Sequence, residues 1–206
     1  MSDATRLPPE DVIRVRVKAE LRKRLRGVRA TLPAEACAAR SARIVSRLLA
    51  HPAILAAKSV ASFWPIVERH EVDLRPFDAS LRARGVRVAY PGIDAETRAM
   101  TFRFSPAEEL EERGFGFCEP APAAPEAAPG DLDVVVVPAI AIDPVGHRIG
   151  YGAGFYDRTI TRFAPPAVTI GVGYDFQLVA EVPFTEHDVA LAYVVTDERE
   201  IDASAV

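Results

Sequence analysis

The sequence has few cysteines, and they do not follow any spacing that binds metal or builds a disulfide framework. Only Cys37 and Cys118 occur in 206 residues. They form neither a Cys-x-x-Cys pair nor a zinc-type pattern. A chain that does without disulfides is typical of a reducing compartment. We therefore expect a cytoplasmic protein whose fold needs no disulfide.

Long apolar runs and a strong excess of charge are also missing. No run approaches the roughly 20 apolar residues that cross a membrane, and the N-terminal residues lack the apolar core of a signal peptide. The net charge of −4 gives no general reason to bind nucleic acid. Hydrophobic residues make up 49% of the chain and charged residues 26%, as in a soluble globular domain. We expect a monomer with neither a membrane nor a nucleic-acid partner.

Apolar segments rich in β-branched residues alternate with helical patterns. Strands are expected at 59–66, 86–90, 100–104, 134–142, 167–174 and 191–196, and helices at about 10–30, 33–50, 73–84 and 155–163. The segments at 134–142 and 167–174 are apolar along nearly their whole length, which is typical of strands buried on both faces of a parallel sheet. Residues 106–118 are expected to form a short acidic helix and turn, 121–131 a surface loop and 197–206 a polar tail. The pattern predicts one three-layer α/β/α domain over 1–206 with a mostly parallel sheet, and a loose tail at 1–9.

The first predicted helix is basic along its whole length. An apolar stripe is formed by Val17, Leu21, Leu25 and Val28. Eight basic residues surround it, namely Arg14, Arg16, Lys18, Arg22, Lys23, Arg24, Arg26 and Arg29. They can be a solvated face or an anion-binding face. Lys18 and Arg22 are one helical turn apart, so their charged groups can converge on one ligand.

A glycine-rich loop lies between the strand at 134–142 and the following helix. Its glycines are Gly146, Gly150, Gly152 and Gly154, flanked by His147, Arg148 and Arg158. Glycines allow the backbone to approach phosphate oxygens, and Asp157 supplies a hard oxygen ligand for Mg²⁺. The spacing matches neither a Walker A loop nor the dinucleotide fingerprint. A tight structural turn is an equal alternative on these residues alone.

The segment 138–158 resembles the signature of the 5-formyltetrahydrofolate cyclo-ligase family, also called methenyltetrahydrofolate synthetases. The matching residues are Pro138, Asp143, Gly146, Arg148, Gly150, Tyr151, Gly152, Gly154, Tyr156, Asp157 and Arg158. Ala153 and Phe155 depart from it, since relatives often have Gly or Lys and Tyr there. Five shorter elements also resemble the family: Lys18-x-x-Leu21-Arg22 followed by Arg29, Glu71-Val72-Asp73, Glu119-Pro120, Asp175-Phe176-Gln177-Leu178 and His187-Asp188.

The resemblance implies a reaction and a set of site residues. The reaction is the conversion of 5-formyltetrahydrofolate to 5,10-methenyltetrahydrofolate with ATP and Mg²⁺, releasing ADP and phosphate. Arg148 and Asp157 are expected to be catalytic. Expected ATP contacts are Lys18, Arg22, Arg148, Gly150, Tyr151, Gly152, Ala153, Gly154 and Tyr156. Expected contacts to the folate, with or without a polyglutamate tail, are Trp64, Glu71, Tyr151, Gly152, Gly154 and Phe155.

Asp157 and Asp188 are the expected ligands of Mg²⁺. Relatives often carry a further acid four residues after the position of Asp188, where this chain has Ala192. Mg²⁺ commonly binds through few protein ligands, with water and phosphate oxygens completing its coordination shell. The metal is therefore expected to bind without that acid.

Several alternatives stay open on the sequence. The basic helix could bind RNA, or the protein could be a paralogue that keeps the ATP site and acts on another formamide-like substrate. Trp64 could belong to the core. Glu71 and Asp157 could each be ordinary acidic residues that stabilise the start of a helix.

Overall fold

The computed structural model describes residues 9–114 and 116–205. Of the tail expected at 1–9, only Pro9 is described, and it begins helix α1 (Pro9–Ala30). The remaining helices are α2 (Ala34–Ala50), α3 (Pro52–Ala56), α4 (Arg75–Ala83) and α5 (Phe155–Ile160). Four single 3₁₀ turns lie at Val67–Arg69, Ala107–Glu109, Asp175–Gln177 and Ala203–Ala205. Within the described ranges, no helix is long and apolar enough to span a membrane.

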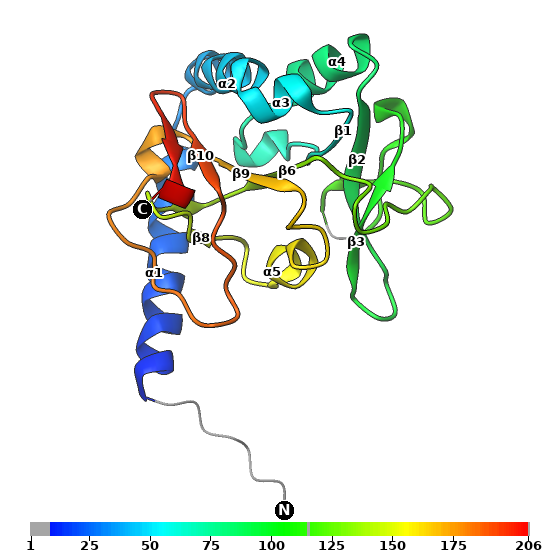
Figure 1. The fold of residues 1–206 in the computed structure, drawn as a ribbon. Helices are drawn as coiled ribbons and strands as arrows, with labels where there is room; N and C mark the ends of the chain where they lie inside the picture. Colours follow the sequence, from blue (N-terminus) through cyan, green and yellow to red (C-terminus); the bar gives the residue numbers. More distant parts are fainter. Residues whose placement is uncertain (1–8, 115, 206) are drawn as a thin grey trace, which may run out of the picture.

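A seven-stranded sheet forms the centre of the molecule, in the order β11-β10-β9-β6-β1-β2-β3 (Figure 1). Its strands are β1 (Ser59–Ala61), β2 (Arg87–Ile93), β3 (Met100–Phe104), β6 (Val134–Pro138), β9 (Val168–Val172), β10 (Tyr193–Val195) and β11 (Glu200–Asp202). All neighbouring pairs from β10 to β2 are parallel, and β3 and β11 join the two edges antiparallel. The mostly parallel sheet is confirmed. β11 was not predicted, because its polar residues lie in the expected tail.

Helices cover both faces of this sheet, which confirms the three-layer prediction. α2, α3 and α4 lie over one face and α5 over the other (Figure 1). Along β6 the side chains alternate between the two layers, as a strand requires. Val134 and Val136 pack in the core under α2 to α4, whereas Val135 and Val137 pack with Ile160 of α5. All four valines are buried, as the continuous apolar run predicted.

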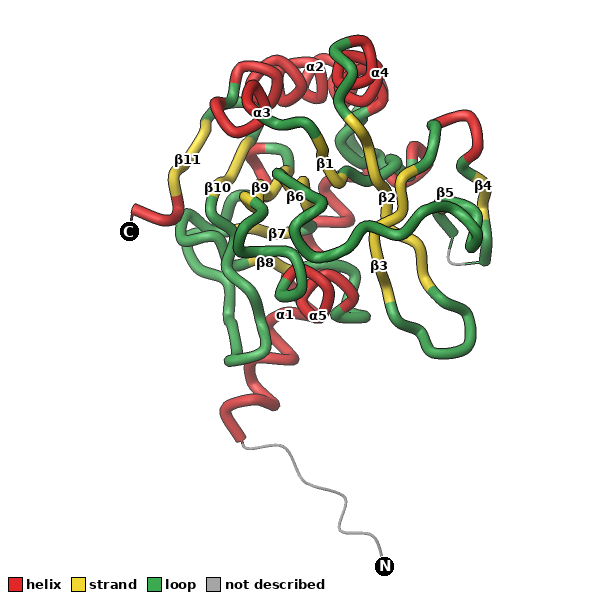
Figure 2. Tube along the Cα trace, turned by 45° about the vertical axis from the view of Figure 1, so that its right-hand side comes forward, coloured by secondary structure: helices red, strands yellow, loops and turns green. Residues whose placement is uncertain are grey.

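The apolar run at 134–142 is two strands and not one. β6 ends at Pro138, and the Ala139 N–H makes the last bond to β9, to the Val172 carbonyl at 3.2 Å. The chain then leaves the sheet, and β7 (Ala141–Ile142) pairs antiparallel with β8 (Arg148–Ile149) in a separate hairpin. Figure 2 shows this hairpin below the main sheet and next to α1 and α5. The glycine loop therefore begins inside the β7–β8 hairpin, and not directly after a strand of the main sheet as predicted.

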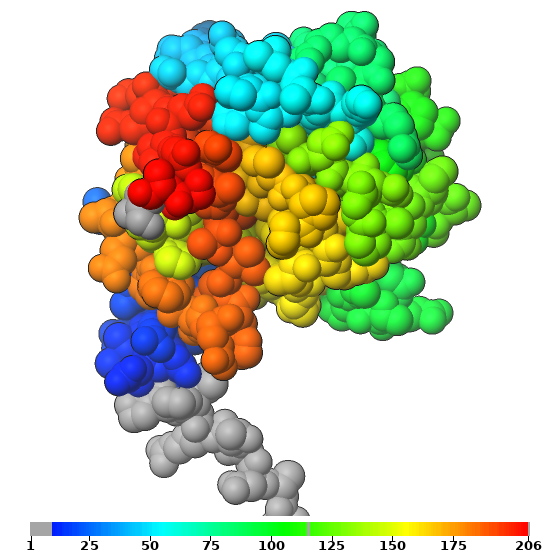
Figure 3. Space-filling model, viewed as in Figure 1, coloured from blue at the N-terminus to red at the C-terminus, as the bar shows by residue number. Residues whose placement is uncertain are grey.

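Helix α1 packs on the β7–β8 hairpin, and only the middle of its predicted apolar stripe is buried. Leu25 packs with Ile140 and Ile149, and Leu21 lies against the same cluster. Val17 and Val28 remain 39% and 41% exposed. The early turns of α1 stand out beside the segment that precedes β10 (Figure 3).

Four smaller differences from the predictions are local. The strand expected at 59–66 stops at Ala61. β2 continues through Pro91, because beyond Ala89 it pairs only with β3, and proline is tolerated where one side of a strand is open. Instead of an acidic helix, 106–118 contain one 3₁₀ turn and a strand that pairs with the next, β4 (Glu111–Glu112) with β5 (Cys118–Glu119). The loop at 121–131 runs along β3, where the Phe104 N–H donates to the carbonyl of Pro125.

Gly146 is the glycine position at which the fold most clearly excludes any side chain. It has φ +87°, and a Cβ there would lie 2.2 Å from the carbonyl oxygen of Leu191. We expect Gly146→Ala to lower the free energy of unfolding by about 2–4 kcal/mol, because backbone overlap adds to the strain. Gly85→Ala is the matched control, since Gly85 has φ +75° with no atom near its Cβ position. In urea unfolding, Gly85→Ala should lower the free energy of unfolding by about 1 kcal/mol. Equal losses would contradict a role for the Leu191 contact.

Candidate active site

A cavity of about 470 Å³ opens at the carboxyl ends of the central strands. Pro138 ends β6, Phe63 and Trp64 follow β1, and Ile93 ends β2, and all four line it. Ligands of parallel sheets bind at this edge. Every residue to which the sequence assigned a role also lines this cavity: Lys18, Arg22, Trp64, Glu71, Arg148, Gly150, Tyr151, Gly152, Ala153, Gly154, Phe155, Tyr156, Asp157 and Asp188. Ala192 does not.

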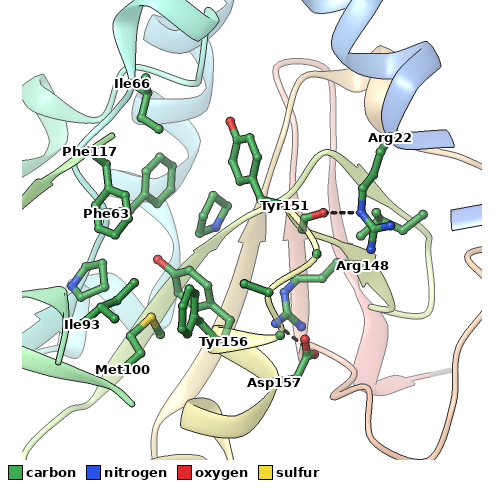
Figure 4. A pocket seen from close by; sticks show the side chains of 18 of the residues that line it. Arg22, Phe63, Ile66, Ile93, Met100, Phe117, Arg148, Tyr151, Tyr156 and Asp157 are labelled. Carbon is green, nitrogen blue, oxygen red and sulfur yellow. Dashed lines mark hydrogen bonds and ion pairs between the residues drawn. The ribbon is translucent and has the colours of Figure 1, made fainter. Parts of the chain in front are cut away.

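One side of the cavity carries three basic side chains that come from α1 and β8. The Arg22 Nε donates to the carbonyl of Gly150 at 2.8 Å, and the Lys18 Nζ lies 2.7 Å from an oxygen of Asp188. The Arg148 Nη2 lies 3.1 Å from Asp157 (Figure 4). Burial lowers the pKa of Arg22, and the charge of Asp188 works in the opposite direction. We call this side the basic half.

The two aspartates of the basic half hold the loop before β10 in place. Asp157 accepts the Val189 N–H at 3.3 Å, while the Arg148 Nη1 donates to the Val189 carbonyl. Asp188 accepts the Thr185 N–H at 2.7 Å. Burial works to raise the pKa of Asp188, but the bonds from Lys18 and Thr185 hold this pKa below its ordinary value. The carboxylate is therefore charged at neutral pH.

The glycine turn needs its glycines for conformation and for space. Gly152 and Gly154 have φ +105° and +65°. A Cβ on Gly154 would lie 2.8 Å from the Arg158 guanidinium, and one on Gly152 would lie 3.6 Å from that of Arg22. A side chain at either position would strain the turn and crowd an arginine. Contact of this backbone with phosphate stays a prediction.

The opposite side of the cavity is mainly apolar, although Arg69 and Arg98 also line the cavity, and it was mostly missed in the sequence. Its main residues are Phe63, Ile66, Ile93, Met100 and Phe117, with Tyr151 and Tyr156 between the two halves (Figure 4). They come from separate loops and strand ends, so no motif joins them. Phe63 and Ile66 follow β1, Ile93 ends β2, Met100 begins β3 and Phe117 precedes β5, so they share no single sequence signal. Trp64 is half-buried and packs edge-on against Tyr90, so it belongs to the core and to the cavity wall at once.

A partly buried polar network joins the two halves. The Tyr151 hydroxyl donates to Glu71, whose other carboxylate oxygen accepts the Ile66 N–H at 2.9 Å. Arg29 donates to the Tyr151 hydroxyl at 2.8 Å and is itself only 5% exposed. The bonds of Glu71 show that its carboxylate does not serve the start of α4. Arg29 had no assigned role in the sequence, because the motif that contains it does not indicate where its side chain points.

The acidic residues are suited to a metal that is shared with a ligand. In the part of the chain that the structure describes, no group of three or more His, Cys, Asp or Glu side chains could hold an ion alone. Asp157 and Asp188 do face one cavity, beside three cations. Mg²⁺ typically uses one or two carboxylates together with phosphate oxygens and water. The residues therefore fit Mg²⁺ bound to a phosphorylated substrate.

The fold and this cavity together define an α/β enzyme with a two-part active site at the carboxyl edge of a parallel sheet. The family model described as the 5-formyltetrahydrofolate cyclo-ligase family matches residues 14–197. The chain therefore belongs to this family of ligases.

Two curated relatives and one solved structure support the assignment. The 5-formyltetrahydrofolate cyclo-ligase of Mycolicibacterium smegmatis is 47% identical over 90 residues, which is 43% of this chain and 46% of that one. The Escherichia coli K12 enzyme of the same name is 30% identical over 75% of this chain and 86% of its own. The NMR structure of Aquifex aeolicus 5,10-methenyltetrahydrofolate synthetase has a TM-score of 0.78 and 30% identity, with 91% and 93% of the two chains covered.

The ion pair between Lys18 and Asp188 predicts a dependence of stability on pH. A carboxyl group whose pKa is lowered by folding stabilises the protein above its ordinary pKa, and this contribution is lost as the pH falls. Lys18→Met should therefore be less stable than the wild type, with a deficit that is greatest above about pH 5 and shrinks towards about pH 3. Urea unfolding at several pH values measures it. The exposed control Arg24→Met should show no such trend, and a constant deficit in Lys18→Met would contradict the pairing.

Proposed function

We propose that this protein converts 5-formyltetrahydrofolate, as the monoglutamate or polyglutamate, to 5,10-methenyltetrahydrofolate with ATP, releasing ADP and phosphate. The observation that carries the proposal is one cavity with two unlike halves. The basic half suits a polyanion, and the apolar half suits a flat ring system. Membership of the cyclo-ligase family supports the same reaction.

The basic half is proposed to bind the phosphates of ATP. Lys18, Arg22 and Arg148 offset phosphate charge, and Gly152 and Gly154 let the backbone approach closely. The apolar half is proposed to hold the pteridine ring between Trp64 and Phe155, with Glu71 and Tyr151 next to its polar edge. The two reactants would then meet beside Tyr151 and Tyr156.

The chemistry needs positioning more than a protein nucleophile. The formyl oxygen attacks the γ-phosphorus and ADP leaves, which makes a phosphorylated iminium-like carbon. The N10 nitrogen then attacks that carbon, loses its proton, and phosphate leaves. Holding both substrates in one cavity removes the entropic cost of their encounter. Arg148 and Lys18 offset the charge on the transferred phosphoryl group.

Mg²⁺ is proposed to bind with ATP, held by Asp157 and Asp188. When bound, it supplies positive charge that neutralises phosphate oxygens. Asp157 bonds Arg148 and Val189 through Oδ1, and Asp188 bonds Lys18 and Thr185 through Oδ2. The other oxygen of each carboxylate would bind the metal, so both ion pairs can persist beside it.

An RNA-binding role for α1 has less support. Lys18, Arg22 and Arg29 make bonds within the protein, and Arg14 pairs with Asp11 at 2.9 Å. These contacts reduce the number of basic residues that a nucleic acid could reach. No observation favours this alternative over the enzyme.

The direct test is an absorbance assay for methenyl-folate, with and without ATP, in parallel with measurement of ADP. We expect product only with ATP, and one ADP for each molecule formed. Product without ATP would contradict the proposal. If ATP is hydrolysed only with another formamide, and not with 5-formyltetrahydrofolate, the protein is the paralogue that acts on another formamide-like substrate.

Arg22 and Arg24 separate a specific phosphate contact from a diffuse basic face. Arg22 lines the cavity, and Arg24 is exposed on the other side of α1. Lys18→Ala and Arg22→Ala should each raise the KM for ATP about tenfold or more, because each removes a charge-assisted contact. Arg24→Ala should leave this KM unchanged. Similar effects at all three positions would favour a diffuse anion-binding face.

Asp157→Asn tests the metal proposal. The asparagine keeps the shape and can still accept the Val189 N–H, so a purely structural role predicts near-normal turnover. Either role predicts some loss of stability, because Arg148 loses a charged partner. A metal ligand predicts in addition a higher Mg²⁺ requirement and a kcat about a hundredfold lower. A Mg²⁺ titration of turnover beside a thermal melt measures both. A normal rate with an unchanged Mg²⁺ midpoint would leave Asp188 as the candidate ligand.

A further inference from the structure

The β4–β5 hairpin carries Phe117 into the apolar half of the cavity (Figure 4). Each of its strands has two residues, and they pair only as Glu111 with Glu119 and Glu112 with Cys118. A hairpin this short is not stable by itself. The position of Phe117 therefore depends on what attaches the hairpin to the rest of the protein.

Glu119 provides an attachment to the main sheet. One of its carboxylate oxygens accepts the N–H of Ile93 at 2.6 Å. Ile93 is the last residue of β2 and lines the same cavity. The bond therefore joins the base of the hairpin to the strand end that forms part of the cavity wall.

The surroundings of Glu119 are unusual for a residue with only a structural task. Glu119 is only 2% exposed, and its second carboxylate oxygen has no hydrogen-bond partner among the described residues. Burial raises the pKa of this carboxyl. Burying a half-satisfied carboxyl group costs free energy. Glu119 thus occupies this place at some cost to stability, as residues kept for a functional position often do.

The far end of the hairpin lies against the other wall of the cavity. A Cβ on Gly116 would lie 3.2 Å from the guanidinium of Arg69. The Arg69 guanidinium in turn lies over the ring of Tyr151, 5.3 Å from its centre. The hairpin therefore spans the apolar half from β2 to the Arg69–Tyr151 pair, and Phe117 lies between these two attachments.

We infer that Glu119 is a positioning residue for the ring-bearing substrate: it holds Phe117 over the apolar half by binding the Ile93 amide. The inference rests on the proposed function. It predicts an effect on folate and not on ATP, because Arg22 and Arg148 bind Gly150 and Asp157 on the opposite side of the cavity (Figure 4).

The experiment compares Glu119→Ala and Glu119→Gln with the wild type. Binding of 5-formyltetrahydrofolate is followed without turnover through the fluorescence of Trp64, the single tryptophan, which lines the same half. KM and kcat are measured for both substrates. Glu119→Ala should weaken folate binding about fivefold to tenfold, with the KM for ATP changed less than about twofold and kcat nearly unchanged. Glu119→Gln should restore most of the affinity, because its amide oxygen can accept the same N–H.

Asp133→Ala is the matched control. Asp133 also binds backbone amides through its carboxylate, those of Lys58 and Ser59 at 2.8 and 2.9 Å. It lies at the amino ends of β1 and β6, on the opposite edge of the sheet. This variant should melt at a lower temperature without changing the ratio of folate to ATP affinity.

Three results would overturn the inference. They are unchanged folate binding in Glu119→Ala, equal loss for folate and ATP, and a glutamine variant no better than the alanine variant. If Glu119→Ala does not fold, Phe117→Ala replaces it and must show the same selective loss. The wild-type measurements test the proposed function separately. If the wild type binds and converts folate but the variants show no selective loss, only the role of Glu119 is refuted. If the wild type binds no folate, both the role of Glu119 and the proposed function are refuted.

Discussion

The departure of the chain from the main sheet after Pro138 organises the active site. β6 pairs with β9 as far as Pro138, and there the chain leaves the sheet for the β7–β8 hairpin. Helix α1 packs on this hairpin through Leu25, and Arg148 and the glycine turn extend from it. The basic half of the cavity thus depends on a short segment outside the main sheet, held at the carboxyl ends of the parallel strands.

Charge balance in the basic half explains how so many cations can lie close together before a ligand binds. Arg148 and Lys18 are each paired with a carboxylate, Asp157 and Asp188, and Arg22 binds a carbonyl. Removing one partner of such a pair leaves a poorly solvated charge, which is costly. The aspartates therefore hold the cations in place before a ligand binds.

The apolar half depends on a different principle. Its wall is assembled from loops that are far apart in sequence, and polar contacts that are partly buried hold two of them. Tyr151 is held by Arg29 and Glu71, and the β4–β5 hairpin by Glu119. Hydrogen bonds shielded from water are directional, so they can set the position of a loop that has little core of its own. The network through Tyr151 also places the glycine turn and Glu71 in one bonded unit.

The sequence by itself determined the local elements and the residues of the basic half. The alternation of buried strands with helices predicted the sheet, and the motif from Pro138 to Arg158 predicted the residues that meet Lys18 and Arg22. Only the tertiary structure decided that the apolar run at 134–142 divides, that Arg29 faces Tyr151, and that Phe117 enters the cavity. The physical reason is the range of the interactions. Periodicity and turn chemistry act between near neighbours, whereas strand order and buried hydrogen bonds join residues such as Ile93 and Glu119, whose pairing no local pattern encodes.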